Sequence, residues 1–213
     1  MYVKVCGITH LDDARSAIAA GADVLGFNFV PASKRRVSVE LARSIIEQIR
    51  GQALAVAVVA DLPTREALEL LSTLAADRLQ LHGDESQDQL RALSPCAFKA
   101  LRVGSAEDVA LALAFPGHPV LVDAKVEGQL GGTGRVVDWP LVAPIARQRP
   151  LILAGGLTPE NVEQAVRSVQ PWGVDTASGV DTSLDPRRKD PEKLRRFVAA
   201  ARRASPGRQE PAF

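Results

Sequence analysis

The chain has 213 residues, with 26 basic and 25 acidic side chains and a formal net charge of +1 at pH 7. This length can bury a sizeable core as one large domain or two small ones, and such a balanced charge argues against nucleic acid as a partner. Hydrophobic residues make up 46% and aromatic residues only 4%, so Ala, Val and Leu must fill the interior, as is typical of helices packed on a buried parallel sheet.

Nothing in the sequence predicts contact with a membrane. Residues 1–4 lack the charged-then-apolar pattern of a signal peptide, and no apolar run approaches the roughly 18 residues that cross a bilayer. The two cysteines, Cys6 and Cys96, lie far apart in the chain, and a domain of this size needs no disulfide. We therefore expect a cytoplasmic protein with reduced thiols.

Short aliphatic strands alternate with amphipathic helices along the whole chain. Strands are predicted at residues 3–6, 24–29, 54–60, 78–81, 98–103, 120–123, 151–154 and 173–176. Helices are predicted after them at 11–20, 39–50, 65–75, 87–93, 106–114, 139–147, 159–169 and 191–203. Thr64 and the pair Thr158-Pro159 are start signals for two of these helices, as a capping residue and a first-turn proline.

Eight strand–helix units are the number that closes a parallel barrel. An open doubly wound sheet is the alternative, because periodicity cannot show closure. Such sheets usually have fewer strands, and no Gly-x-Gly-x-x-Gly follows the first strand here. We predict an α/β fold, a single (β/α)8 TIM barrel, with the catalytic domain over residues 1–203 and a disordered tail over 204–213.

Cys6 ends the first predicted strand, the position from which barrel enzymes present catalytic side chains. The thiol is therefore a candidate nucleophile or base rather than core filler. Lys4 lies two residues earlier and points to the same face of the strand. If that face is the barrel interior, the Lys4 ammonium favours the thiolate. The alternative is a lysine that only pairs with a carboxylate inside the barrel.

Asp123 emerges from the apolar sixth strand, where burial favours the protonated carboxyl that a general acid needs near neutral pH. Capping a turn or pairing with Lys125 is the alternative role. Strands one and six lie on opposite sides of an eight-stranded barrel, so we expect Cys6 and Asp123 to face each other across its mouth. This arrangement suits a reaction in which one proton is removed from a small substrate and another is delivered.

Two glycine-containing loops follow the seventh and eighth strands. The first contains Gly155-Gly156 and the second Ser178-Gly179. Exposed backbone N–H groups bind anions, and these two loops form the usual phosphate site of barrel enzymes. Either pair alone fits an ordinary turn. Two pairs in neighbouring loops predict phosphate binding by backbone dipoles and hydroxyls, since neither loop contains a lysine.

Three further features are less specific. The basic run Lys34-Arg35-Arg36 is either a solvated surface segment or the source of an arginine that binds a substrate carboxylate. His82 ends the fourth strand, where a lone histidine is more often a hydrogen-bonded structural residue. No cluster has metal-ligand spacing, so no metal is expected. The run Gly-Gly-Thr-Gly at 131–134 predicts a mobile lid.

Together these motifs resemble the phosphoribosylanthranilate isomerase family, the Amadori-rearranging barrel enzymes of tryptophan biosynthesis. The resemblance covers nearly the whole chain, and the order and spacing of the motifs are highly specific although each motif alone is weak. The motifs are KVCGIT at 4–9, GFNF at 26–29, PxSxRxV at 31–37, LQLHG at 79–83, VDA at 122–124, GGTG and DW within 131–139, LAGGL at 153–157, GVD and SGV within 173–180, and KDPEK at 189–193.

The resemblance implies N-(5-phosphoribosyl)anthranilate as substrate and 1-(2-carboxyphenylamino)-1-deoxyribulose 5-phosphate as product. Asp123 matches the general acid that protonates the furanose ring oxygen, and Cys6 matches the base that removes the proton from the adjacent sugar carbon. Arg35 matches the arginine that binds the anthranilate carboxylate, although Lys34 and Arg36 flank it. The implied substrate-binding residues are Arg35, His82, Gly155, Gly156, Asp175, Ser178 and Gly179.

The resemblance also implies an enzyme without a metal or organic cofactor. We expect a monomer or homodimer that acts on a small phosphorylated molecule, with no nucleic-acid or membrane partner. The chain departs from the family pattern at Ala177, where a hydroxyl is common, and at Asp181, which replaces a frequent glutamate.

Related phosphate-binding barrels are the nearest alternatives. The isomerase of histidine biosynthesis uses carboxylates in both proton-transfer roles, so a cysteine at position 6 argues against it. Indoleglycerol-phosphate synthase relies on catalytic lysines. A non-catalytic phosphate- or flavin-binding barrel is an alternative of another class, but it has no use for Cys6 and Asp123 poised across one pocket.

Overall fold

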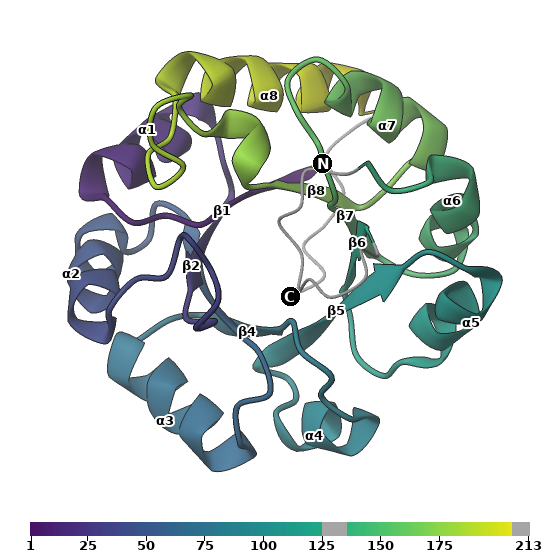
Figure 1. Ribbon diagram of the computed structural model, residues 1–213, viewed down its shortest axis with the longest axis horizontal. Coiled ribbons are helices and arrows are strands. Elements are labelled where there is room, and N and C mark those ends of the chain that lie inside the picture. Colours follow the sequence, from purple (N-terminus) through teal and green to yellow (C-terminus); the bar gives the residue numbers. More distant parts are fainter. Residues whose placement is uncertain (125–135, 206–213) are drawn as a thin grey trace.

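The computed structural model describes residues 1–124 and 136–205. Eight parallel strands close into a barrel, and their order around it follows the chain (Figure 1). The barrel is closed because the first strand pairs with the last, with Lys4 opposite Asp175. The strands are β1 (Tyr2–Cys6), β2 (Val24–Asn28), β3 (Leu54–Val59), β4 (Arg78–Leu81), β5 (Ala97–Val103), β6 (Val120–Ala124), β7 (Leu151–Leu153) and β8 (Gly173–Thr176). The predicted TIM barrel is confirmed.

A ring of helices surrounds the barrel (Figure 1). The helices are α1 (Leu11–Ala20), α2 (Val39–Ile49), α3 (Thr64–Leu74), α4 (Gln87–Ala92), α5 (Ala106–Ala114), α6 (Trp139–Gln148), α7 (Val162–Val169) and α8 (Pro191–Ala204), with a short 3₁₀ helix, η1 (Ser178–Val180), after β8. Helix α8 packs against both α7 and α1 and so completes the ring. Within the described ranges, no helix has the length and apolarity needed to cross a bilayer.

The predicted element boundaries hold to within one residue, except at the start of α7. That helix begins at Val162 rather than at residue 159. The Asn161 side chain accepts the Thr158 N–H at 2.8 Å and donates to the Gly156 carbonyl at 2.9 Å. Residues 158–161 therefore form a turn that holds the loop after β7. The predicted Thr64 cap is also wrong, because Pro63 is the N-cap and no side chain caps α3.

Side chains alternate along the strands, so the barrel has two apolar layers. Outward-facing residues such as Val3 and Leu25 pack against the helices in the larger layer. Inward-facing residues such as Val56, Phe98 and Leu121 fill the barrel interior together with Cys6. Polar side chains that point inward must find partners inside the barrel, because burying them unpaired is costly.

Three sequence predictions fall partly or wholly outside the described residues. Helix α8 continues through Ala204, one residue beyond its predicted end. The rest of the predicted tail, from residue 206 on, lies outside the described residues. So do the predicted lid at 131–134 and Lys125, the alternative partner of Asp123.

Candidate active site

Cys6 lies at the carboxyl end of β1, points into the barrel and is 8% exposed. Burial raises the pKa of its thiol above the ordinary value. The Lys4 ammonium acts in the opposite direction, Asp175 raises the pKa further, and the Lys189 ammonium lowers it. The expected influence of Lys4 is present, but burial outweighs it and the protonated thiol is the favoured form.

Gly26 on β2 leaves the space that the thiol needs. It pairs with Cys6 in the sheet. A Cβ at this position would lie 2.8 Å from the Cys6 Sγ and 3.2 Å from the Lys4 Nζ. Any side chain here would displace the sulfur or the ammonium. The sequence motif includes Gly26, but no pattern along one strand shows a clearance between two strands.

Lys4 and Asp175 form a buried ion pair between β1 and β8, with Nζ and Oδ1 3.0 Å apart. Burial raises the pKa of Asp175, and Lys4 lowers it. Burial alone lowers the pKa of Lys4, but Asp175 and Cys6 raise it above the ordinary value. Both expectations for Lys4 therefore hold: it pairs with a carboxylate, and it acts on the thiol. Asp175, a predicted substrate-binding residue, is the carboxylate of this pair.

Asp123 lies at the carboxyl end of β6 and is 7% exposed. Its Oδ1 accepts the Ala124 N–H at 2.8 Å. Its Oδ2 faces the Nε2 of His82 at 3.6 Å. A Cβ at Gly155 would lie 3.1 Å from Oδ1, so this glycine brings the loop after β7 directly to the carboxyl group.

The strand order puts β7 and β8 between the two candidate proton-transfer residues. Going around the barrel from β6, which presents Asp123, the next strands are β7, β8 and then β1, which presents Cys6. The two predicted phosphate-binding loops follow β7 and β8, so they lie between the candidate acid and the candidate base.

These two loops pack into one continuous surface. Gly155 and Gly156 have φ of +82° and +62°, the left-handed conformation that favours glycine. The Thr176 hydroxyl donates to the Leu157 carbonyl at 2.9 Å, and a Cβ at Gly179 would overlap that same carbonyl. Within the described part of the chain, the N–H groups of Gly155 and Gly156 have no acceptor, as a phosphate site requires.

Ser178 is exposed at the start of η1, in the loop after β8. Among the described residues its hydroxyl has no hydrogen-bond partner, whereas the Thr176 hydroxyl donates to the Leu157 carbonyl. Ser178 is therefore the hydroxyl that is available to a ligand between the two loops.

Arg35 is the member of the basic run that points into the site. Its Cδ lies so close to Gly7, the residue after Cys6, that a Cβ there would overlap it. Lys34 and Arg36 are exposed. The Arg35 Nε donates to Asp181 Oδ2 at 3.0 Å, and Nη2 donates to the same oxygen.

Asp181 and Lys189 belong to the site although sequence analysis assigned them no role. The buried Lys189 ammonium donates to Asp181 Oδ1 at 2.7 Å. Burial lowers the pKa of Lys189, and Asp181 raises it. One carboxylate thus holds a lysine with one oxygen and Arg35 with the other. The only sequence signal was that both residues fall within or beside family motifs.

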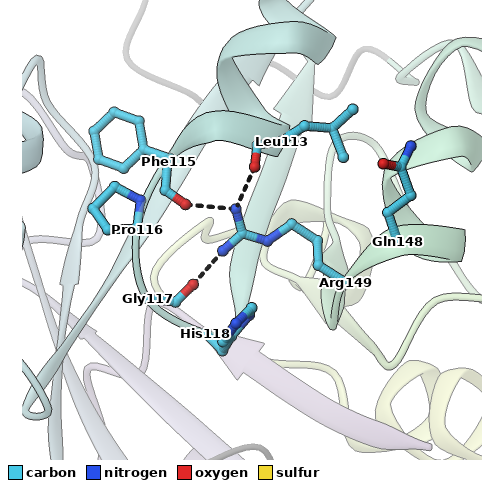
Figure 2. Close-up of a pocket in the computed structure, with 7 residues that line it drawn as sticks. All are labelled: Leu113, Phe115, Pro116, Gly117, His118, Gln148 and Arg149. Atoms are coloured by element: carbon cyan, nitrogen blue, oxygen red, sulfur yellow. Dashed lines mark hydrogen bonds between the residues drawn. The ribbon is translucent and has the colours of Figure 1, made fainter.

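A pocket of about 300 Å³ lies at the opposite end of the strands (Figure 2). It is lined by the loop before β6 and the end of α6, and it contains no predicted site residue. The Arg149 guanidinium forms part of its wall and donates to the carbonyls of Ala112, Leu113, Phe115 and Gly117. Every one of these acceptors belongs to the end of α5 or the segment after it.

Over residues 1–124 and 136–205, no group of three or more His, Cys, Asp or Glu side chains could hold a metal ion. Cys6 and Cys96 are both free thiols.

Comparison with known proteins gives the family. Residues 3–200 match the family model of N-(5′-phosphoribosyl)anthranilate isomerase. The chain belongs to the N-(5′-phosphoribosyl)anthranilate isomerase family. It is 44% identical to the family member of Magnetococcus marinus, over 96% of this chain and 97% of that protein. It is 42% identical to a member from Pseudomonas fluorescens, over 95% and 96% of the two chains.

Solved structures agree with this assignment. The isomerase of Thermotoga maritima superposes with a TM-score of 0.87 and 35% identity, over 95% of this chain and 98% of that one. A second isomerase structure, in complex with reduced 1-(o-carboxyphenylamino)-1-deoxyribulose 5-phosphate, has a TM-score of 0.84 and 34% identity over the same shares. The predicted family, and an isomerase of tryptophan biosynthesis, are confirmed, and the other barrel families are set aside.

Proposed function

We propose that this isomerase carries out its Amadori rearrangement with Asp123 as general acid and Cys6 as general base. The proposal is based on the strand order β6-β7-β8-β1. It puts the acid and the base at either end of a surface whose middle is the pair of anion-binding loops. A sugar phosphate held there through its 5′-phosphate has its ring between the two proton-transfer groups.

In the first step, Asp123 donates its proton to the furanose ring oxygen. The bond from that oxygen to C1 breaks, and the nitrogen lone pair forms the iminium. Since Oδ1 accepts the Ala124 N–H, Oδ2 is the oxygen that bears the transferred proton. The resulting carboxylate lies near the new positive charge and stabilises it.

In the second step, Cys6 removes the proton from C2. The electron pair of that C–H bond forms the C1=C2 bond of the enolamine and neutralises the iminium nitrogen. Protonation at C1 and loss of the C2 hydroxyl proton then give the ketone. Cys6 acts here as a thiolate, which the Lys4 and Lys189 ammonium groups stabilise against the effect of burial.

Arg35 binds the anthranilate carboxylate in this proposal. Asp181 accepts hydrogen bonds from Nε and Nη2, which leaves Nη1 for the substrate. Charge-assisted hydrogen bonds of this kind orient a carboxylate as well as bind it. The position of Arg35 over Gly7 supports this role, because the anthranilate ring is attached to C1, next to the carbon that Cys6 deprotonates.

We further propose that the chain works in the cytoplasm as a monomer or homodimer. A base that is a free thiol benefits from a reducing compartment. A solved relative from Thermotoga maritima is described as a dimeric enzyme from which monomers were generated, so both states occur for this fold.

The direct test is turnover. Purified protein is mixed with phosphoribosylanthranilate, and the loss of anthranilate-type fluorescence is followed. We expect rapid loss with the wild type and with Cys96→Ser, which removes the other thiol. A folded wild-type protein without turnover contradicts the activity. Unchanged turnover by Cys6→Ser or Asp123→Asn contradicts the assigned roles instead.

A further inference from the structure

We propose that Gln80 is a positioning residue that keeps a proton on the Nε2 of His82, so that His82 cannot accept the proton of the general acid. The inference rests on the proposed role of Asp123. Neither sequence motifs nor family membership assigns this role to Gln80, whose side chain is inside the barrel and 1% exposed.

The geometry fixes the tautomer of His82. Gln80 lies on β4 and His82 follows the strand two residues later, so both side chains lie on the same, inward side. The Gln80 Nε2 is 3.0 Å from the His82 Nδ1. An amide nitrogen only donates, so Nδ1 must be the acceptor, and a neutral imidazole then has its proton on Nε2.

The reversed amide is the competing arrangement. It would turn the Gln80 Oε1, which has no partner among the described residues, toward a protonated Nδ1. It would also point the bare Nε2 lone pair of His82 at the Asp123 carboxylate. When Asp123 is ionised, that contact is repulsive, so the observed orientation is favoured.

The tautomer matters because of which Asp123 oxygen bears the proton. Oδ1 is occupied by the Ala124 N–H, and Oδ2 faces the His82 Nε2 at 3.6 Å. A bare Nε2 would accept the Oδ2 proton after a small rotation and keep it from the substrate. A protonated Nε2 can only donate, so it leaves the Oδ2 proton directed at the furanose oxygen. The present distance is longer than a hydrogen bond, and catalytic contacts commonly tighten when substrate binds.

The charged groups around this pair have partners of their own. Asp175 on β8 acts electrostatically on Asp123 and His82 but is paired with Lys4 of β1. Arg102 on β5 is paired with Asp84. Among the described residues, Gln80 is therefore the group that decides which His82 nitrogen holds the proton.

Nitrogen NMR tests the inference without any assay of turnover. The chain has three histidines, and ¹⁵N labelling of their rings, with His82→Gln for assignment, gives the protonation of each His82 nitrogen. We expect the proton on Nε2 in the wild type. We expect it on Nδ1 in Gln80→Glu, whose carboxylate accepts rather than donates. A wild-type His82 with its proton on Nδ1 overturns the proposal.

Kinetics supply the second test. Gln80→Met keeps the side-chain volume but removes the donor, and we expect kcat to fall roughly tenfold or more with little change in KM, as for other residues that orient a functional histidine. In a His82→Ala background, the same substitution should have no further effect on kcat. Equal losses in both backgrounds, in variants with wild-type circular dichroism, would show a merely structural role and overturn the proposal.

The proposed function and the role of Gln80 can be tested separately. If the wild type does not turn over phosphoribosylanthranilate, the proposed function fails while the NMR result for His82 stands. If the wild type turns over but His82 carries its proton on Nδ1, only the inference about Gln80 fails.

Discussion

Both ends of the barrel bury positive charge, but they compensate it differently. At the carboxyl end, the Lys4 and Lys189 ammonium groups lie 3.0 and 2.7 Å from the carboxylates of Asp175 and Asp181. At the amino end, the buried Arg149 donates to main-chain carbonyls (Figure 2). No ion pair of Arg149 with a carboxylate occurs among the described residues.

The two kinds of partner indicate different roles for the buried charges. Carboxylates titrate, and they can share a cation with an anionic substrate. The ion pairs around Cys6 can therefore adjust when a substrate binds or a proton moves. Carbonyls do neither. Two of them, those of Ala112 and Leu113, belong to the last turn of α5, whose carbonyls have no intrahelical donors, so Arg149 caps the end of this helix. Burial lowers the pKa of Arg149, yet a guanidinium stays charged. We expect the carboxyl end to determine rate and the amino end to determine stability.

The largest effect should come from the proton-transfer residues. We expect Cys6→Ser and Asp123→Asn each to lower kcat by more than about 100-fold, because a positioned acid or base contributes about 10²–10⁴. Thermal unfolding should stay close to that of the wild type, since both side chains keep their size. Cys96→Ser is the control and should retain full activity. A large drop in thermal stability with an unchanged kcat would instead show that these residues stabilise the fold and do not determine the rate.

The amino end should show the opposite behaviour in Arg149→Met. We expect the free energy of unfolding to fall by about 2–4 kcal/mol, because carbonyls bonded to a charged donor lose about 1.5–3 kcal/mol each when the donor is removed and water replaces only some of it. The kcat of the folded variant should be unchanged. Urea denaturation measures the first and the fluorescence assay the second. The exposed neighbour Arg147 provides the matched variant, Arg147→Met, which should change stability by less than about 0.5 kcal/mol.

A smaller effect should separate two adjacent arginines at the carboxyl end. Arg35→Gln should raise KM for phosphoribosylanthranilate about tenfold, because a hydrogen bond to a charged group contributes about 1.5–3 kcal/mol, while kcat changes little. Arg36→Gln is the matched control, since Arg36 is exposed. If Arg36→Gln raises KM and Arg35→Gln does not, the carboxylate site lies elsewhere on the loop.

The smallest predicted effect is a shift in the pH at which Cys6 becomes reactive. Because burial raises the pKa of Cys6, its thiolate fraction grows only above the value of about 8.5 that an ordinary thiol has. Alkylation of Cys6 in a Cys96→Ser background should therefore reach its half-maximal rate above that pH. Half-maximal alkylation at or below pH 8.5 would show that the two lysines outweigh burial.

The same raised pKa affects stability in a defined direction. A Cys6 thiol that stays protonated in the folded state contributes stability below the unfolded pKa, and that contribution is lost as the pH rises through the folded pKa. Cys6→Ser should therefore flatten the alkaline decline in the free energy of unfolding, measured by urea denaturation between neutral and alkaline pH.

Some of the site was predictable because it follows from local pattern. Strand periodicity put Cys6 and Asp123 at strand ends, and closure of the barrel turns strand ends into one rim. The glycine pairs after β7 and β8 were visible for the same reason. Asp181 and Lys189 were not, because Asp181 matters through its contact with Arg35, 146 residues away in the chain, and Lys189 through its contact with Asp181.

The fold, the family and the chemical groups at the rim were predictable from the sequence, because alternating apolar periods and collinear motifs are properties of the chain. How those groups act on one another was visible only in the tertiary structure. It showed that burial outweighs Lys4 at the thiol, that Arg35 rather than Arg36 points into the site, and that the Gln80 amide nitrogen lies 3.0 Å from the His82 Nδ1. Each of these outcomes depends on the desolvation of a group or the distance between atoms, and neither exists before the barrel closes.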